Sequence, residues 1–130
     1  MAMHIGEVAA RTDLSLRSLR HWEDVGLVVP SGRSEGGFRL YAEEDVERIL
    51  FVRRMKPLGF TLDEMKAVMA DLAALRDPVA PQADRTRAGE HLADVQRDAG
   101  ERRAKLERQV AMADEFLGLL SDELERPATF

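Results

Sequence analysis

The sequence predicts a mainly α-helical fold, in which four short helices and a two-stranded hairpin are followed by one long coiled-coil helix. Apolar residues recur at helical spacing in four short segments before residue 76. The prolines of "RDPVAPQ" then mark a boundary, and beyond it leucine or alanine returns every seven residues from Leu92 to Leu120. We therefore expect a first domain over residues 1–75, a linker over 76–84 and a coiled-coil helix over 85–126.

The first two helices are predicted within "IGEVAARTDLSLRSLRHWEDVG". The break "TDLS" ends the first helix, and Ser15 is a good N-cap for the second. Leu16 and Leu19 lie on one side of this second helix, and Gly26 stands where helices commonly end. The polar side chains expected on its other side are Arg17, Ser18 and His21.

A hairpin is predicted next, with "LVVP" as one strand and "FRLY" as the other. "FRLY" has the alternation and aromatic content of a strand, and "SGRSEGG" supplies a long tip that contains glycine. Alternation places Phe38 and Leu40 on one face of this strand and Arg39 and Tyr41 on the other.

The third and fourth helices are predicted in "AEEDVERILFVRRMK" and "LDEMKAVMADLAAL". The acidic start and basic end of the third suit the helix dipole. "PLGF" separates the two helices, and Thr61 with Glu64 forms a capping box for the fourth. The buried stripe expected on the third helix is Val46, Ile49, Leu50 and Met55.

The long helix carries a coiled-coil pattern that is clearest in its second half. Gly89 and Gly100 each destabilise such a helix by about 1 kcal/mol relative to alanine, so they mark either a late start or a bend. The residues expected to form the dimerisation seam are Leu92, Leu106, Val110, Ala113, Phe116, Leu117 and Leu120.

The composition is that of a globular protein, with 33% charged and 45% hydrophobic residues among 130. No apolar run suits a membrane span or a signal peptide, so we expect a cytoplasmic protein with no membrane partner. The absence of cysteine excludes disulfides, thiolate metal sites and cysteine nucleophiles. The net charge of −5 argues mildly against nucleic acid, but binding follows local patches, and residues 17–56 hold eight basic against seven acidic side chains.

Two short helices with a tight turn, followed by a hairpin, form a winged helix-turn-helix pattern. The second helix of such a pattern fits the major groove of DNA, and the hairpin reaches the neighbouring backbone. Phosphate contacts supply most of the affinity, while a few side chains at base edges supply sequence preference. The pattern therefore indicates a protein that binds double-stranded DNA.

Residues 4 to about 70 closely resemble the MerR family of bacterial transcription regulators, through "IGEVAARTDLSLRSLRHWEDVGLVVP" and "RSEGGFRLYAEEDVERILFVRRMKPLGFTLDEM". The resemblance implies a sequence-specific regulator that binds a two-fold-symmetric promoter site as a homodimer. It implies that the long helix pairs antiparallel with its twin. It also implies that the protein bends and untwists promoter DNA, and that it affects RNA polymerase indirectly through that DNA.

The resemblance also implies which residues contact DNA. Arg17 and Ser18 would face the bases, and Arg20 and His21 the groove edge. The hairpin would be a wing that contacts the backbone, and the end of the third helix would belong to a second wing-like element. The whole set expected at the interface is Ser15, Arg17, Ser18, Arg20, His21, Arg33, Phe38, Arg39, Tyr41, Arg53, Arg54 and Lys56.

The sequence departs from the family pattern at several positions. His21 and Trp22 stand where many members have two tyrosines, and histidine is a shorter donor that can be neutral at pH 7. Ala42 replaces the usual Ser or Thr cap, and the loss of this cap lowers helix stability by about 1 kcal/mol. Pro57 falls in the expected last turn of its helix and removes one backbone donor.

Several residues have a second interpretation that does not involve DNA. Arg39 could be a solvated strand residue paired with Glu35 or Glu43. Tyr41 and Trp22 are more typical of a core or a hinge than of a DNA contact. Phe38 suits either packing under the wing or contact with sugar–phosphate. The basic residues Arg53, Arg54 and Lys56 are also common at helix C-termini in proteins that do not bind DNA.

The sequence does not reveal an effector, and we expect no cofactor. Only about six residues follow the long helix, so no appended ligand domain is expected. Glu90, His91, Asp94 and Asp98 have spacings that suit a hard or borderline metal, but such charge clusters usually form a solvated helix face. The alternatives to a regulated DNA binder are a ligand-independent architectural DNA binder and a coiled-coil protein-interaction module. No nucleophile–base pair is evident, so an enzyme is not expected.

Overall fold

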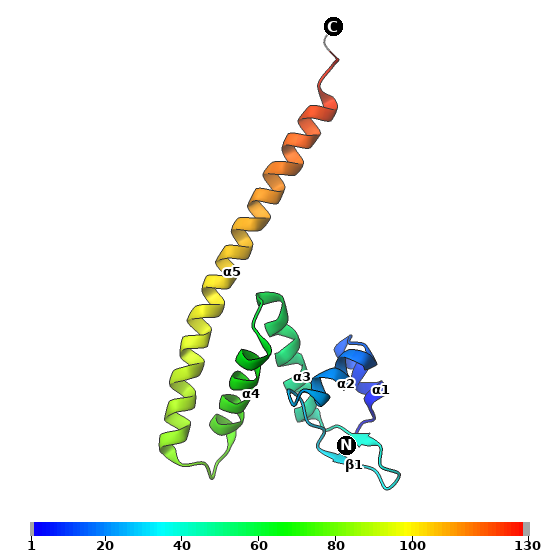
Figure 1. Cartoon of the computed structure of the whole chain (residues 1–130), viewed down its shortest axis with the longest axis vertical. Helices are drawn as coiled ribbons and strands as arrows, with labels where there is room; N and C mark the ends of the chain where they lie inside the picture. The colour runs from blue at the N-terminus through cyan, green and yellow to red at the C-terminus, as the bar shows by residue number, and fades with distance from the viewer. Residues whose placement is uncertain (1, 129–130) are drawn as a thin grey trace. The chain divides into compact units, whose positions relative to one another are not determined.

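The computed structural model describes residues 2–128, which form the mainly α-helical arrangement predicted from the sequence (Figure 1). The chain forms two compact units, one up to Leu92 and one from Ala93. The elements in chain order are α1 (Ile5–Thr12), α2 (Leu16–Asp24), β1 (Gly32–Arg33), β2 (Arg39–Leu40), α3 (Glu43–Met55), the 3-10 helix η1 (Lys56–Leu58), α4 (Leu62–Arg76) and α5 (Gln82–Glu125).

The turn between α1 and α2 is built by local hydrogen bonds. The C-cap of α1, Asp13, adopts a left-handed conformation with φ 55°, and its backbone N–H donates to Ala9 O. Ser15 caps α2 as predicted, because its Oγ accepts from Ser18 N at 3.0 Å. Gly26 follows the other end of α2 with φ 79°, a conformation that favours glycine. These contacts fix where α2 begins and ends.

The wing differs from the predicted hairpin in its first strand. β1 is Gly32–Arg33, and it pairs antiparallel with β2 so that Gly32 lies opposite Leu40 and Arg33 opposite Arg39. The expectation that "LVVP" forms a strand is wrong. Leu27 and Val28 are buried, and both of their backbone N–H groups donate to Trp22 O, which closes the end of α2 instead.

The chain just after the second wing strand pairs with the segment that precedes α1. Met3 and Tyr41 form an isolated antiparallel bridge, with N···O distances of 2.7 and 2.8 Å in the two directions. At the tip of the wing, Ser34 accepts from Gly37 N at 2.9 Å, and Gly37 has φ 82°. The wing is therefore tied at its root to the segment before α1 and turns tightly at its tip.

The core of the first unit surrounds α3, which packs against both α1 and α4. Val8, Ile49 and Val52 are fully buried there. Leu50, which was expected in the buried stripe of α3, is only half-buried, and Val52 takes its place. Burial of each such side chain contributes about 1.5–3 kcal/mol to the stability of the fold. This core therefore stabilises the unit that carries α2 and the wing.

Asp45 compensates for the missing cap at Ala42. Its carboxylate is 1% exposed, and Oδ2 accepts from Ala42 N at 2.8 Å and from Ser31 N at 3.1 Å. The hydroxyl of Ser31 donates to the same oxygen. Because Ala42 has no side-chain acceptor, the Asp45 carboxylate supplies the side-chain cap at the start of α3. The same carboxylate holds Ser31, at the entry to the wing.

Pro57 does not disturb α3, because the helix ends at Met55 and Pro57 lies at the start of η1. A proline at the start of a helix removes a donor that would have no partner there in any case. Gly59, with φ 80°, then ends η1. The predicted capping box of α4 is confirmed, with Thr61 N donating to Glu64 Oε1 at 2.8 Å and Glu64 N to Thr61 Oγ1 at 3.2 Å.

The long helix α5 begins at Gln82, three residues before the predicted start, and continues without a break through Gly89 and Gly100. The non-helical segment before it is limited to residues 77–81. Ala88 is 3% exposed, and the carboxylate of Asp71 on α4 pairs with Nδ1 of His91 on α5. The first turns of α5 are therefore packed on α4 within the first unit.

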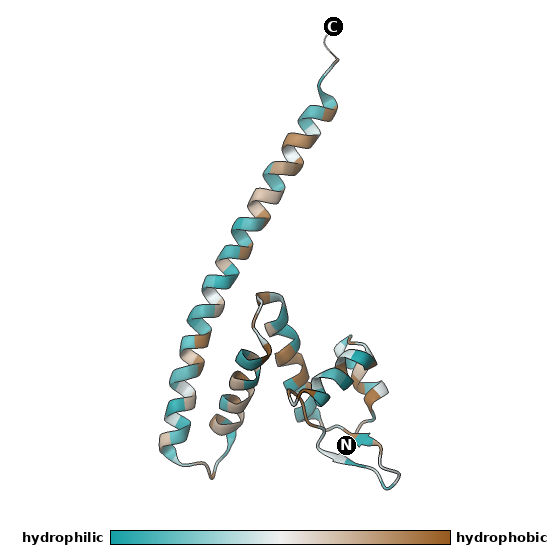
Figure 2. Cartoon of the chain, viewed as in Figure 1, coloured by the Kyte–Doolittle hydropathy of each residue, from teal (hydrophilic) through white to brown (hydrophobic). Residues whose placement is uncertain are grey.

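Beyond residue 93, large apolar side chains of α5 are exposed, and Figure 2 shows hydrophobic positions recurring along this part of the helix. No helix within residues 2–128 combines the length and hydropathy that a membrane span requires.

Candidate nucleic-acid interface

Helix α2 presents a polar face to solvent and buries the opposite face. Leu19 and Trp22 are 2% and 4% exposed, whereas Arg17, Arg20 and His21 are exposed. The apolar side of α2 is fixed in the core, so the orientation of its polar side is fixed as well. This is the arrangement that a helix inserted into a major groove requires.

The two serines at the start of α2 are occupied by the cap. Ser15 Oγ accepts from Ser18 N, and Ser15 Oγ also donates to Ser18 Oγ at 3.0 Å. Ser18 is half-buried. Ser15 therefore caps α2 and positions its first turn, which carries Arg17.

The wing exposes an aromatic ring and two guanidinium groups. Phe38 is 67% exposed, so it is not packed under the wing. Arg33 and Arg39 lie directly opposite each other on β1 and β2. Arg33 Nη1 donates to Gly37 O at 3.2 Å, which holds its side chain along the wing.

Both wing arginines pair with the same carboxylate, Glu23, in the last turn of α2. Arg33 Nη2 lies 3.5 Å from Glu23 Oε1, and Arg39 Nε pairs with Oε2. The expected alternative partners of Arg39 were Glu35 and Glu43, and this expectation is corrected by the ion pair with Glu23. Sequence reasoning missed Glu23 because the contact depends on how α2 and the wing are folded together.

Tyr41 is 2% exposed and therefore belongs to the core at the root of the wing. Burial raises the pKa of Tyr41, and the negative charge of Glu23 raises this pKa further. The inclusion of Tyr41 among the DNA contacts is corrected, because its ring is enclosed by protein. Trp22 is buried in the same way, and Lys56 Nζ lies 5.8 Å from the centre of its ring.

The basic end of α3 lies beside the helix-turn-helix. Arg53 Nη2 is 3.8 Å from Asp13 Oδ2, in the turn between α1 and α2. Arg54 and Lys56 are exposed, and Lys56 is placed against Trp22 of α2. The basic residues at the end of α3 thus lie next to the helix-turn-helix, which carries the basic residues of α2.

A shallow cavity of about 430 Å³ joins the start of α1, the polar face of α2 and the wing. His4, which immediately precedes α1, was not among the expected interface residues. The sequence signal that could have identified His4 is its position just before the first helix. The residues that line the cavity are His4, Ile5, Arg20, Gly37, Phe38 and Arg39.

Two family models match this chain over most of its length. The model described as "MerR HTH family regulatory protein" matches residues 3–72, and the model described as "MerR, DNA binding" matches residues 46–116. The chain belongs to the MerR family. Its α1, α2, wing and α3 lie in the first matched region, and much of α5 lies in the second.

Curated members of the MerR family align with this chain over different lengths. Heavy metal-dependent transcription regulator 2 of Rhizobium meliloti is 34% identical over 114 residues, which cover 88% of this chain and 69% of that protein. CueR of Vibrio cholerae is 37% identical over 76% of this chain and 70% of its own length. The activator TipA of Streptomyces coelicolor is 41% identical over 62% of this chain, which spans only 31% of the length of TipA.

Solved structures of MerR proteins have the same fold. PbrR691 of Ralstonia metallidurans, solved with lead(II), is 29% identical and superposes with a TM-score of 0.52 over 98% of this chain and 91% of its own. HiNmlR, a MerR family regulator lacking the sensor domain and bound to promoter DNA, is 22% identical, with a TM-score of 0.64 over 95% and 84% of the two chains.

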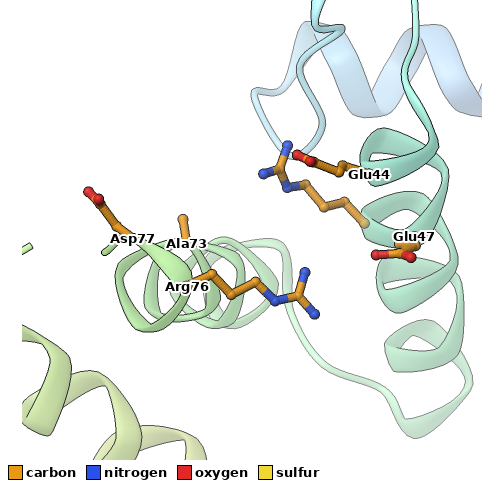
Figure 3. Close-up of a pocket in the computed structure, with 6 residues that line it drawn as sticks. Glu44, Glu47, Ala73, Arg76 and Asp77 are labelled. Atoms are coloured by element: carbon orange, nitrogen blue, oxygen red, sulfur yellow. The ribbon is translucent and has the colours of Figure 1, made fainter. Parts of the chain in front are cut away.

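A groove of about 490 Å³ lies between α3 and α4 of this MerR protein (Figure 3). Its lining is mostly charged, whereas sites for drug-like ligands are predominantly apolar. In Figure 3 the side chains of Glu44 and Glu47 come from α3 and that of Arg76 from α4. The groove therefore lacks the chemistry of an apolar effector site.

The acidic cluster on α5 is committed to ion pairs. His91 pairs with Asp71, Asp94 with Arg97, and Asp98 with Arg102 at 3.1 Å. Within residues 2–128, no group of three or more potential metal ligands is placed to hold an ion. Three of the four residues of this cluster are therefore held in ion pairs with neighbouring side chains.

Proposed function

We propose that this MerR-family protein is a sequence-specific transcription regulator that binds a two-fold-symmetric promoter site as a homodimer. In this proposal the polar face of α2 enters the major groove, with Arg17 nearest the bases. The wing and the end of α3 contact phosphates on either side. The regulatory role is supported by relatives that are named transcription regulators and that align with this chain over most of their own length.

The observation on which the proposal depends is that basic side chains from separate elements share one surface. Arg20 of α2 and Arg39 of the wing line the same cavity, next to His4. The chain as a whole is acidic, with a net charge of −5. A local basic surface on an acidic protein is what phosphate binding requires, since affinity for DNA follows the local patch.

The dimer is supported by the apolar face of α5. Helices gain most of their stability from packing, and α5 beyond residue 93 leaves a series of large apolar side chains exposed in the single chain. A second copy that covers this face would bury them. The large exposed side chains of the predicted seam are Leu106, Val110, Phe116, Leu117 and Leu120.

We propose that the dimer bends and untwists the DNA between its two half-sites. Bending a site of this kind costs on the order of 1–6 kcal/mol. Phosphate contacts from both wings, joined through a stiff helix pair, can supply this energy. RNA polymerase would then respond to the altered DNA.

The effector, if the regulator has one, would differ from thiolate-bound metals. The relative from Rhizobium meliloti is named for heavy metals, but this chain has no cysteine to provide soft ligands. The protein would therefore respond to another class of molecule or act without one.

The experiment that tests the proposal is selection of bound duplexes from a random DNA pool by the purified protein. We expect the selected sequences to share a two-fold-symmetric motif with half-sites about one helical turn or a multiple of a turn apart. A pool that gains no common motif after repeated rounds would contradict sequence-specific binding. A motif without symmetry would contradict the dimer.

A further inference from the structure

The contact between Glu23 and the wing suggests a role beyond the proposed phosphate contacts. Glu23 belongs to α2, whereas Arg33 and Arg39 belong to the two strands of the wing. The carboxylate of Glu23 forms an ion pair with each of these arginines, and the side chain of Glu23 is 14% exposed. Glu23 Oε2 and Arg39 Nε are both shielded from solvent. The helix and the wing are thus joined by a partly desolvated electrostatic contact.

The register of the wing explains why a carboxylate is needed there. Arg33 and Arg39 are a directly opposed pair across β1 and β2, and like charges in that arrangement repel each other. Glu23 lies against both and reduces the local charge from +2 to +1. The nearby charge of Glu23 also acts on buried Tyr41, whose pKa is raised. The cluster therefore includes the wing root as well as its arginines.

The ion pairs leave part of each guanidinium available. Arg39 pairs through Nε, and its side chain is 30% exposed, while the side chain of Arg33 is 53% exposed. A guanidinium has five N–H donors, so it can hold a carboxylate on one edge and a phosphate on another. Glu23 can accordingly remain in contact with the wing arginines while they bind DNA.

We propose that Glu23 is a specificity-determining residue, which ties the wing arginines to α2 and limits their binding to phosphates of non-cognate DNA. The inference rests on the proposed function. Because of this tie, the wing is placed on the backbone only where α2 has the correct register in the groove. Because of its charge, Glu23 weakens phosphate binding by the wing on every sequence, so that base contacts by α2 contribute a larger share of the binding energy.

The test compares two duplexes and two variants of the full chain. One duplex is recovered by selection from a random pool with the unmodified protein, and the other is a shuffled sequence of the same composition. Glu23→Gln removes the charge but keeps an oxygen that can accept from Arg39. Glu35→Gln removes the same charge from an exposed position in the wing turn and serves as the control.

We expect Glu23→Gln to bind the shuffled duplex more tightly, with a salt dependence steeper by about one unit. The ratio of affinities for the selected and shuffled duplexes should fall by roughly tenfold, and Glu35→Gln should leave it within about twofold. Circular dichroism should show that both variants are folded. If Glu23→Gln weakens both duplexes by the same factor, or if Glu35→Gln lowers the ratio equally, the inference is overturned. Failure to select any duplex would instead overturn the proposed function.

Discussion

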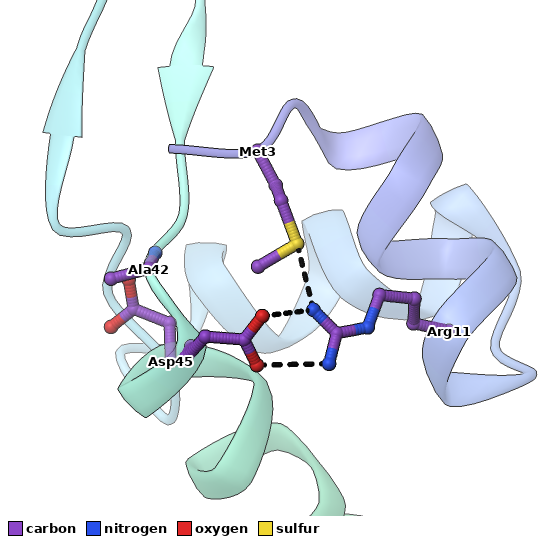
Figure 4. A network of polar contacts seen from close by, with 5 residues as sticks. Met3, Arg11, Ala42 and Asp45 are labelled. Atoms are coloured by element: carbon purple, nitrogen blue, oxygen red, sulfur yellow. Dashed lines mark hydrogen bonds and ion pairs between the residues drawn. The ribbon is translucent and has the colours of Figure 1, made fainter. Parts of the chain in front are cut away.

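Arg11 and Glu43 join α1 to α3 through two parallel hydrogen bonds (Figure 4). Arg11 Nη1 donates to Oε1 at 2.5 Å and Nη2 to Oε2 at 2.8 Å, and Nη1 also lies 3.1 Å from the sulfur of Met3. Figure 4 shows Met3 beside the second wing strand, so this contact lies where α1, α3 and the wing root meet. Both side chains are exposed, so its effect on stability is modest.

We expect Glu43→Gln to lower the melting temperature slightly at pH 7 and to have no effect in acid. The hydrogen bonds from Arg11 lower the pKa of Glu43 below its usual 4.5. A carboxyl whose pKa is lowered by folding stabilises the protein above its unfolded pKa, and this contribution disappears as pH falls through the folded pKa. Thermal melts of wild type and Glu43→Gln at a series of pH values check this. A difference that persists in full well below pH 4.5 would contradict it.

We expect Asp45→Ala to destabilise the first unit by about 2–4 kcal/mol, because it leaves the N–H groups of Ser31 and Ala42 without their acceptor. Asp45→Asn keeps one oxygen acceptor and should be milder. Urea denaturation monitored by the fluorescence of Trp22 measures both variants. Equal stability of Asp45→Ala and wild type would show that this acceptor does not hold the wing entry.

We expect Arg39→Ala to weaken binding to all duplexes and to reduce the salt dependence by about one phosphate contact. The physical reason is that its guanidinium lies on the wing, which in the proposed complex contacts the DNA backbone rather than the bases. Arg87→Ala, on the exposed surface of α5, removes the same charge and is the matched control. A salt slope that equals that of the wild type would remove Arg39 from the interface.

We expect Leu106→Glu combined with Leu120→Glu to produce monomers, as measured by light scattering. Both leucines are exposed members of the predicted seam of α5, where two charges would be buried in the proposed dimer. The control is Ala111→Glu combined with Gly118→Glu, which adds the same charge on the opposite side of the helix. A dimeric seam variant, or a control that also dissociates, would place the dimer interface elsewhere.

Local signals in the sequence were sufficient to predict several features of the fold. The cap at Ser15 and the capping box of Thr61 and Glu64 involve residues three positions apart, so their geometry follows from the sequence once a helix is assumed. The continuous helix α5 follows from its heptad spacing, although its glycines left a bend or late start open.

Features that depend on contacts distant in sequence were not predicted. The first wing strand was misplaced because the bridge between Met3 and Tyr41 and the closure of α2 by Leu27 determine where pairing begins. The pairing of Glu23 with both wing arginines spans 10 and 16 positions and has no periodic signal. Burial of Tyr41 likewise depends on how the wing root packs on the core.

The most direct test of sequence-specific recognition is the pair of dissociation constants of the unmodified protein for the selected duplex and its shuffled counterpart at one salt concentration. Base contacts from α2, made by both subunits of a dimer, should give a preference of at least about 10³ for the selected duplex. The mass of the complex should correspond to two chains on each duplex. Equal dissociation constants, or one chain on each duplex, would contradict the account.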